Sequence, residues 1–197
     1  MTIPTLARIA GASSLTLMLA ACMDVAMTVD VTSQTEAEAT MVTTMERDMY
    51  DLMMAQATEQ DEEFCAEGEL VESADTVECT LVRSGPFADL EFDGEEGEDP
   101  IIEEIGGGQV RVAFPTSDLT ESLSEEIDPA QDAQMQAMIA SIFEGHTITM
   151  TVSGGAITDT NMELAADGQS ATFEIPFTDL FSPELDLPGE IYAVVQK

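Results

Sequence analysis

The sequence predicts an α+β domain, in which an antiparallel sheet of about six to eight strands carries two or three helices on one face. Segments of alternating polarity near both ends of the chain predict the strands, and capped helix starts predict the helices. The chain has 197 residues, of which 44% are hydrophobic, so one domain can bury a core.

The first predicted strand covers Asp24 to Thr32, where Val25, Met27, Val29 and Val31 share one face. A second strand follows at Ala37 to Thr43. Alternation and turn residues predict the remaining strands at Thr76–Arg83, Gln109–Phe114, His146–Val152, Asn161–Ala165, Ala171–Phe177 and Ile191–Val195, with a hairpin turn at Asp167-Gly168.

The clearest helix start lies at Asp128, which serves as N-cap before Pro129 and Gln131. Gly145 ends this helix. A capping box at Thr43-Thr-Met-Glu46 predicts another helix, with an apolar stripe of Met45, Met49, Leu52 and Met53. The glycine- and acid-rich stretch Asp61–Ser73 is expected to be a loop or a weak hairpin around Cys65, and Phe87–Pro100 is expected to be a surface loop.

The N-terminus has the pattern of a secretion signal, because Arg8 precedes an acid-free apolar run too short to cross a bilayer, which takes about 20 residues. The following Leu19-Ala-Ala-Cys22 resembles a bacterial lipobox, in which the cysteine thiol receives a diacylglyceryl group. We expect residues 1–21 to be a lipoprotein signal peptide, and residues 22–197 to form a single extracytoplasmic domain. The acyl chains at Cys22 would make the membrane its partner.

The residue after Cys22 bears on location within the cell envelope. In the sorting rule of Gram-negative lipoproteins, Asp directly after the cysteine retains the protein at the inner membrane. Met23 stands there and Asp24 follows it. We therefore expect the domain to face the periplasm or the exterior, with the outer membrane favoured over the inner.

Acidic residues dominate the charge, with 40 Asp and Glu against 5 Lys and Arg and a formal net charge of −35. Such a surface repels phosphate backbones, so the sequence predicts no nucleic-acid partner. The acids are spread along the whole chain, which favours a solvated surface over cation capture.

Two cysteines remain after Cys22. Exported domains fold in an oxidising compartment, so Cys65 and Cys79 are expected to form a disulfide. Their spacing is not that of a CxxC motif, which argues against a redox or zinc site.

The sequence predicts no catalytic residues and no cofactor. His146 is the only histidine, and its place after a helix end favours a structural role. The motifs of serine hydrolases, zinc proteases, P-loop enzymes and dinucleotide-binding enzymes are absent. Carboxylates are too abundant for any pair to indicate acid–base catalysis.

Two stretches invite a metal interpretation, and for both we expect an ordinary role. Asp89-Leu-Glu91-Phe-Asp93-Gly94 resembles the first half of a calcium loop, but Pro100 stands where the bidentate Glu belongs, which favours a solvated loop. Thioethers at Met41, Met45, Met49 and Met53 recur every fourth residue and could hold Cu(I). A methionine-rich helical core face is the favoured interpretation.

Three stretches together resemble the LppM-type bacterial lipoprotein domain. They are Cys22–Val31 with the strand pair leading to Met49-Tyr50, Thr147–Thr158, and Asp167–Phe177 ahead of a closing strand. The resemblance implies an α+β fold with an apolar concavity and a lipid- or envelope-binding role, and it implies no catalytic residues. Many members carry a C-terminal membrane helix. This chain ends at Lys197 without one, so we expect the lipid to be its anchor.

The expected function is therefore a non-enzymatic, lipid-anchored envelope protein that binds a hydrophobic ligand or an envelope partner. Two alternatives stay open at this point. One is an envelope hydrolase that uses acidic residues, and the other is an acidic surface protein that binds Ca²⁺.

Overall fold

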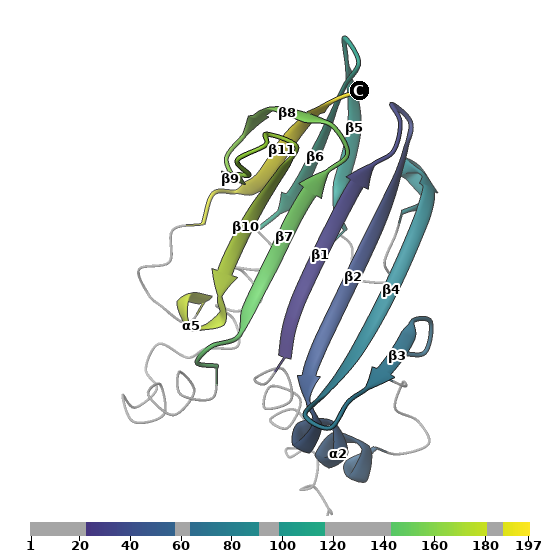
Figure 1. The fold of residues 1–197 in the computed structure, drawn as a ribbon, viewed down its shortest axis with the longest axis vertical. Coiled ribbons are helices and arrows are strands. Elements are labelled where there is room, and N and C mark those ends of the chain that lie inside the picture. The colour runs from purple at the N-terminus through teal and green to yellow at the C-terminus, as the bar shows by residue number, and fades with distance from the viewer. Residues whose placement is uncertain (1–22, 58–63, 91–98, 117–142, 181–186) are drawn as a thin grey trace, which may run out of the picture.

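Strands dominate the structure, a computed structural model that describes residues 23–57, 64–90, 99–116, 143–180 and 187–197. They make up 59% of the described residues and form two sheets of seven and four strands (Figure 1). The predicted α+β class is therefore wrong. A second sheet, rather than a layer of helices, packs on the core face of the large sheet.

The seven-stranded sheet, sheet A, has the order β3-β4-β2-β1-β7-β10-β9. Its strands are β1 (Met23–Val31), β2 (Glu36–Glu46), β3 (Glu69–Glu72), β4 (Thr76–Pro86), β7 (Thr147–Ser153), β9 (Glu163–Leu164) and β10 (Ser170–Pro176). All neighbours are antiparallel except β1 and β7, which are parallel with Val25 opposite Ile148. The expectation of a fully antiparallel sheet is thus also wrong at this central pair.

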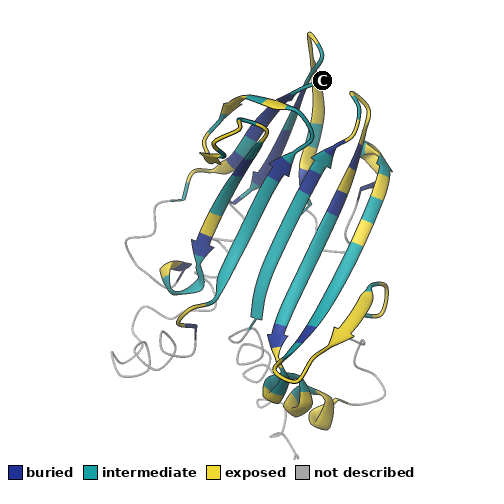
Figure 2. Cartoon of the chain, in the orientation of Figure 1, coloured by how far each residue is buried: buried dark blue, intermediate teal, exposed yellow. Residues whose placement is uncertain are grey.

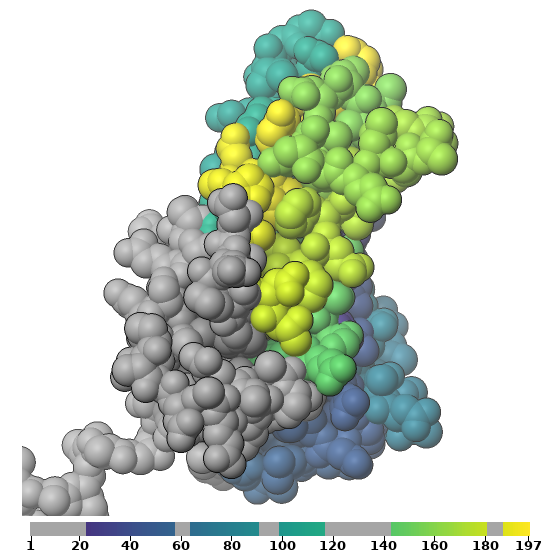
Figure 3. Space-filling model, turned by 90° about the vertical axis from the view of Figure 1, so that its left-hand side faces the viewer, coloured from purple at the N-terminus to yellow at the C-terminus, as the bar shows by residue number. Residues whose placement is uncertain are grey.

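The four-stranded sheet, sheet B, has the order β5-β6-β11-β8 and is antiparallel throughout. Its strands are β5 (Ile101–Gly106), β6 (Gln109–Pro115), β8 (Ala156–Thr160) and β11 (Glu190–Gln196). Of these, β5 and β8 were not predicted from the sequence. Figure 3 views the molecule from the left-hand side of Figure 1. The C-terminal part of the chain, coloured green to yellow, forms a continuous column on that side.

Met45 and Val77 are buried at the end where β1 begins, but most of the hydrophobic core lies between the two sheets toward the other end of the molecule. We call this the upper end, where β1 ends at Val31, and the end where β1 begins at Met23 the lower end. Val29, Val31 and Val152 from sheet A are fully buried in one cluster with residues of sheet B, namely Val110, Val112, Phe114, Ile191, Ala193 and Val195. Because successive side chains of a strand point to opposite faces, alternate residues of β1, β6 and β11 are directed inward.

Two α-helices are described, and neither forms a layer over the sheet. Helix α2 (Arg47–Gln56) lies at the lower end beside β2 and β4, and α5 (Phe177–Leu180) is a single turn after β10 (Figure 1). A short 3-10 turn, η2 (Phe87–Asp89), follows β4.

The capping box predicted at Thr43 to Glu46 is wrong. These residues belong to β2, which stays paired with β4 as far as Glu46, opposite Thr76. The helix begins only at Arg47, and Glu46 makes no side-chain cap bond. Pairing on both sides of β2 therefore outweighs a local capping signal.

The helix predicted from Asp128 lies outside the described residues, apart from its final positions at 143–145. Gly145 has a φ of +92°, a backbone conformation that suits glycine and accords with a chain reversal there. Two residues before it, Phe143 is buried and its ring stacks on that of Phe177, with 5.7 Å between the ring centroids.

Candidate functional site: an apolar band on the large sheet

The inner face of sheet A carries two adjacent rows of apolar side chains that continue below the core. Strand register places the residues of each row opposite one another on five neighbouring strands, β4, β2, β1, β7 and β10. We call these ten residues the apolar band. The first row is Leu81, Met41, Met27, Met150 and Phe173, and the second is Cys79, Thr43, Val25, Ile148 and Ile175.

The apolar band is only partly buried. In the next row toward the upper end, Ala39, Val29, Val152 and Ala171 are fully buried. Every member of the band is half-buried except Ile175, which is 2% exposed. Figure 2 shows this change along β1, β2 and β7, from dark blue near the upper end to teal in the middle. The band therefore continues the core as a surface that solvent partly reaches.

Charge is absent from the apolar band, although the chain carries 40 acidic residues. Thr43 is its one member with a free polar group, since Cys79 is bonded to Cys65. The opposite face of the same strands is mostly polar, with a row of threonines at 40, 28, 151 and 172, although Ala26, Val42 and Val82 also lie on it. The two faces of sheet A thus differ sharply in chemistry, as expected where only one of them packs on apolar groups.

The predicted disulfide between Cys65 and Cys79 is confirmed, and it lies at the β4 edge of the band. Gly68 fits closely against it, because a Cβ on this residue would lie 2.8 Å from Cys65 Sγ and 2.9 Å from Cys79 Sγ. The bridge therefore holds the segment before β3 against the edge of the sheet.

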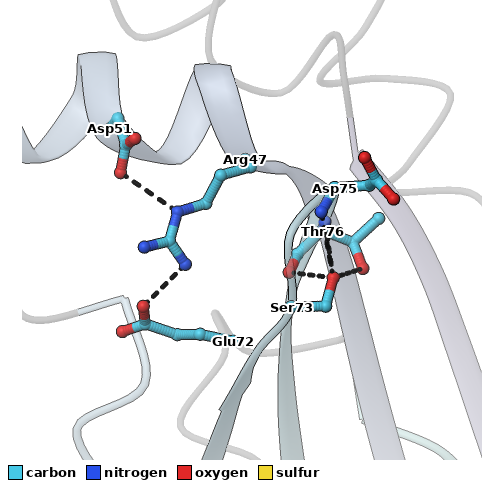
Figure 4. A network of polar contacts seen from close by, with 6 residues as sticks. All are labelled: Arg47, Asp51, Glu72, Ser73, Asp75 and Thr76. Atoms are coloured by element: carbon cyan, nitrogen blue, oxygen red, sulfur yellow. Dashed lines mark hydrogen bonds and ion pairs between the residues drawn. The ribbon is translucent and has the colours of Figure 1, made fainter.

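A polar network at the lower end connects α2 to the hairpin between β3 and β4 (Figure 4). Arg47 Nη1 lies 2.6 Å from Glu72 Oε2, and Arg47 Nε lies 3.4 Å from Asp51 Oδ1. The hydrogen bond to Glu72 is the main cause that raises the pKa of Arg47 above its ordinary value. Ser73 organises the hairpin, since its Oγ accepts hydrogen bonds from the backbone N–H groups of Asp75 and Thr76.

His146 lies beside Asp24 rather than beside a nucleophile. The distance from His146 Nδ1 to Asp24 Oδ2 is 3.4 Å, and Asp24 Oδ1 accepts a hydrogen bond of 2.8 Å from the backbone N–H of Thr147. The contact joins the start of β1 to the start of β7 at the lower end.

The candidate calcium ligands fall mostly outside the described residues. Asp89 is exposed at the end of η2, while Glu91 and Asp93 are not described. Within the described ranges, no group of three or more His, Cys, Asp or Glu side chains is arranged to hold a metal ion.

The four methionines at every fourth residue do not form one helical face. Met41 and Met45 belong to β2, and Met49 and Met53 belong to α2. The predicted stripe is wrong because the strand continues through Met45, which is 2% exposed. Met41 instead faces Met27 and contributes to the apolar band.

The predicted lipidation residue, Cys22, lies outside the described residues. Met23, the residue after it, begins β1 at the lower end. In the described part of the chain, no helix is long and apolar enough to cross a membrane.

Comparison with known proteins supports the fold. No protein-family model matches the chain, and no curated protein matches it in sequence. The NMR structure of the folded domain of the Mycobacterium tuberculosis LppM protein is similar to this one, with a TM-score of 0.50. The similarity covers 89% of this chain and 90% of that chain, at 10% sequence identity. At this level of identity, the likeness concerns the fold alone.

Proposed function

We propose that this protein is a lipid-anchored lipoprotein of the cell envelope that binds a hydrophobic ligand, such as a lipid acyl chain, on the apolar band. The observation that carries the proposal is an uncharged, half-buried surface five strands wide in a chain with a net charge of −35. The lipobox-like segment that ends at Cys22 supports the anchor. The fold shared with the LppM domain supports a lipoprotein domain in general.

The physical properties of the band suit an acyl chain. Neighbouring strands are about 4.8 Å apart, so the five strands present a surface roughly 19 Å across. Met27, Met41 and Met150 lie at its centre, and unbranched thioether side chains adapt to ligands of irregular shape. The acidic surface disfavours anionic headgroups, so we expect a ligand with a neutral or cationic headgroup.

Ligand binding is tested first by native mass spectrometry of the protein purified from envelope, where co-purified lipid is the expected result. Displacement of a fluorescent fatty acid then locates the site. The Met27→Gln change should weaken binding about tenfold, because a buried apolar side chain contributes about 1.5–3 kcal/mol.

The neighbouring Thr28→Gln change is the matched control, since Thr28 is also half-buried but lies on the opposite face of β1. Equal loss of binding in both variants would contradict a site on the apolar band. Hydrolysis of the added lipid during the assay would instead support the alternative of an envelope hydrolase.

The anchor has its own test. The Cys22→Ser variant should incorporate no labelled fatty acid and should keep its signal segment. Equal labelling of the variant and the wild type would show that Cys22 is not the acylated residue.

A further inference from the structure

We infer that the C-terminal end of α2 is a second membrane contact, lying in the interface of the bilayer that holds the acyl chains. The inference rests on the proposed anchor at Cys22 and adds an orientation of the domain on the membrane. It depends on where α2 lies, on which of its residues are exposed, and on how its backbone ends.

Position is the first argument. Met23, which directly follows Cys22, pairs with Met45 in β2, and α2 begins two residues after Met45. The chain from the anchor therefore enters the fold at the end of sheet A that carries α2 (Figure 1). With no residue between Cys22 and β1, the lower end is held close to the membrane surface.

The exposure of α2 is the second argument. None of its residues is buried, and Leu52 and Met54 are 51% and 48% exposed (Figure 2). The exposed residues continue through Ala57, and the segment Leu52–Ala57 contains no charge. Leu52 and Met54 point to different sides of the helix, so the helix would contact lipid by its end rather than by one stripe.

Two carbonyl groups near this end of α2 have partners within the helix. The N–H of Ala57 donates to the carbonyl of Met53 at 2.9 Å, and the Gln56 side-chain amide donates to the carbonyl of Leu52 at 3.2 Å. Carbonyl groups with internal partners cost less to move from water into the interfacial region.

The two ends of α2 differ in charge. Arg47, Asp48 and Asp51 lie in its first half, and the guanidinium of Arg47 contacts Asp51 and Glu72. The acidic chain as a whole is repelled by anionic lipid, so the partner that fits the uncharged end is a zwitterionic bilayer surface. Side chains at such an interface are buried by about 5–10 Å.

The absence of tryptophan from the chain makes the contact measurable with a single introduced fluorophore. The full-length, acylated Leu52→Trp variant is reconstituted on phosphatidylcholine vesicles that carry brominated acyl chains. We expect loss of fluorescence relative to vesicles without bromine, and emission at a shorter wavelength on either kind of vesicle than in the same variant without vesicles.

The matched control is Ile105→Trp, because Ile105 is also an exposed apolar residue, 48% against 51%, but lies in β5, whose hairpin with β6 is at the upper end. Its emission should not change. The Met54→Trp variant repeats the test at a second position and should behave like Leu52→Trp. Quenching that is equal at residues 52, 54 and 105, or absent from all three, overturns the inference.

Vesicle flotation of the same samples separates this inference from the anchor. Variants that are acylated and float with the vesicles, but show no quenching at residues 52 and 54, overturn the helix contact alone. Protein that neither carries acyl chains nor floats overturns the anchor, and the helix contact with it.

Discussion

Gly154 and Lys197 show how single residues hold the upper end together. The ammonium group of Lys197 donates to the carbonyl oxygens of Val31 at 2.7 Å and Gly154 at 2.5 Å. Gly154 has a φ of +108°, and a Cβ there would lie 2.7 Å from the backbone nitrogen of Val31 and closer still to its carbonyl oxygen. The turn after β7 can therefore approach the end of β1 only with glycine at this position.

The Gly154→Ala change should lower the free energy of unfolding by about 3 kcal/mol or more, since overlap with a packed backbone adds to the cost of a positive φ. Gly168→Ala is the matched control. Its φ is +69°, and a Cβ there meets nothing within 4 Å, so it should cost only about 1 kcal/mol. Urea denaturation measures both, and equal losses would contradict the close approach.

Tyr192 titrates under the influence of a nearby carboxylate. Its phenol donates to Asp159 Oδ2 at 3.3 Å, and the negative charge of Asp159 is the main cause that raises its pKa above the ordinary value. The guanidinium of Arg111, 4.8 Å from the ring centroid, acts in the opposite direction.

In a Tyr50→Phe background, Tyr192 is the only tyrosine, so phenolate absorbance reports it alone. The Asp159→Asn change should lower its pKa toward about 10. A raised pKa means that the folded state holds the proton more tightly, so this contribution to stability is present below about pH 10 and is lost as the pH rises through the folded pKa. Titration curves that coincide with and without Asp159 would refute the assignment.

At the scale of elements, the parallel pair β1 and β7 is fixed at both ends by aspartates of β1. Asp24 accepts a hydrogen bond from the N–H of Thr147 at 2.8 Å, and Asp30 accepts one from the hydroxyl of Ser153 at 2.8 Å. These contacts join segments 123 residues apart in sequence. They fix the register that aligns Val25 and Met27 with Ile148 and Met150 in the apolar band.

Replacing either aspartate by alanine should lower the free energy of unfolding by about 1–3 kcal/mol, because a hydrogen-bonding partner is left without its acceptor. Glu104→Ala removes the same charge from an exposed position on β5 and should leave stability unchanged or slightly raised. If Asp24→Ala and Glu104→Ala gave the same melting temperature, the proposed role of Asp24 would be wrong.

Most strands of the fold are predictable from local patterns. The alternation in β1, β6 and β7 and the apolar run in β11 locate these strands to within one or two residues. The strand β5, with the sequence IIEEIG, lacks such alternation, and β8 has only five residues directly after a glycine turn. The two predicted strands of sheet B, β6 and β11, do not by themselves indicate a second sheet. Helices were therefore the expected second layer.

Part of the apolar band is also predictable from the sequence. The faces Val25–Met27 and Ile148–Met150 follow from alternation within each strand. Their adjacency does not, because a parallel pair depends on a long connection that leaves no local signal. Leu81 joins the band through β4, and its place on that face depends on pairing with Met41.

At the scale of the whole molecule, the described cations are held by neighbouring groups. Arg47, Arg83 and Arg111 contact Glu72, Glu67 and Glu190, and Lys197 binds backbone carbonyls. With 40 acids against 5 bases, nearly all of the negative charge has no cationic partner within the chain. Mutual repulsion of these carboxylates therefore opposes folding.

Salt should stabilise this protein by screening that repulsion, which at 0.1 M already confines interactions to about 10 Å. If the acids serve only to solvate the surface, Na⁺, Mg²⁺ and Ca²⁺ should raise the melting temperature alike at equal ionic strength. A calcium site made by Asp89, Glu91 and Asp93 would instead give a rise at low calcium alone, by mass action. The Asp93→Ala change would then abolish that increment. We expect the uniform response, because Pro100 occupies the position at which a bidentate carboxylate completes a calcium loop. A rise at micromolar calcium that magnesium does not reproduce would show that the acidic loop is a metal site.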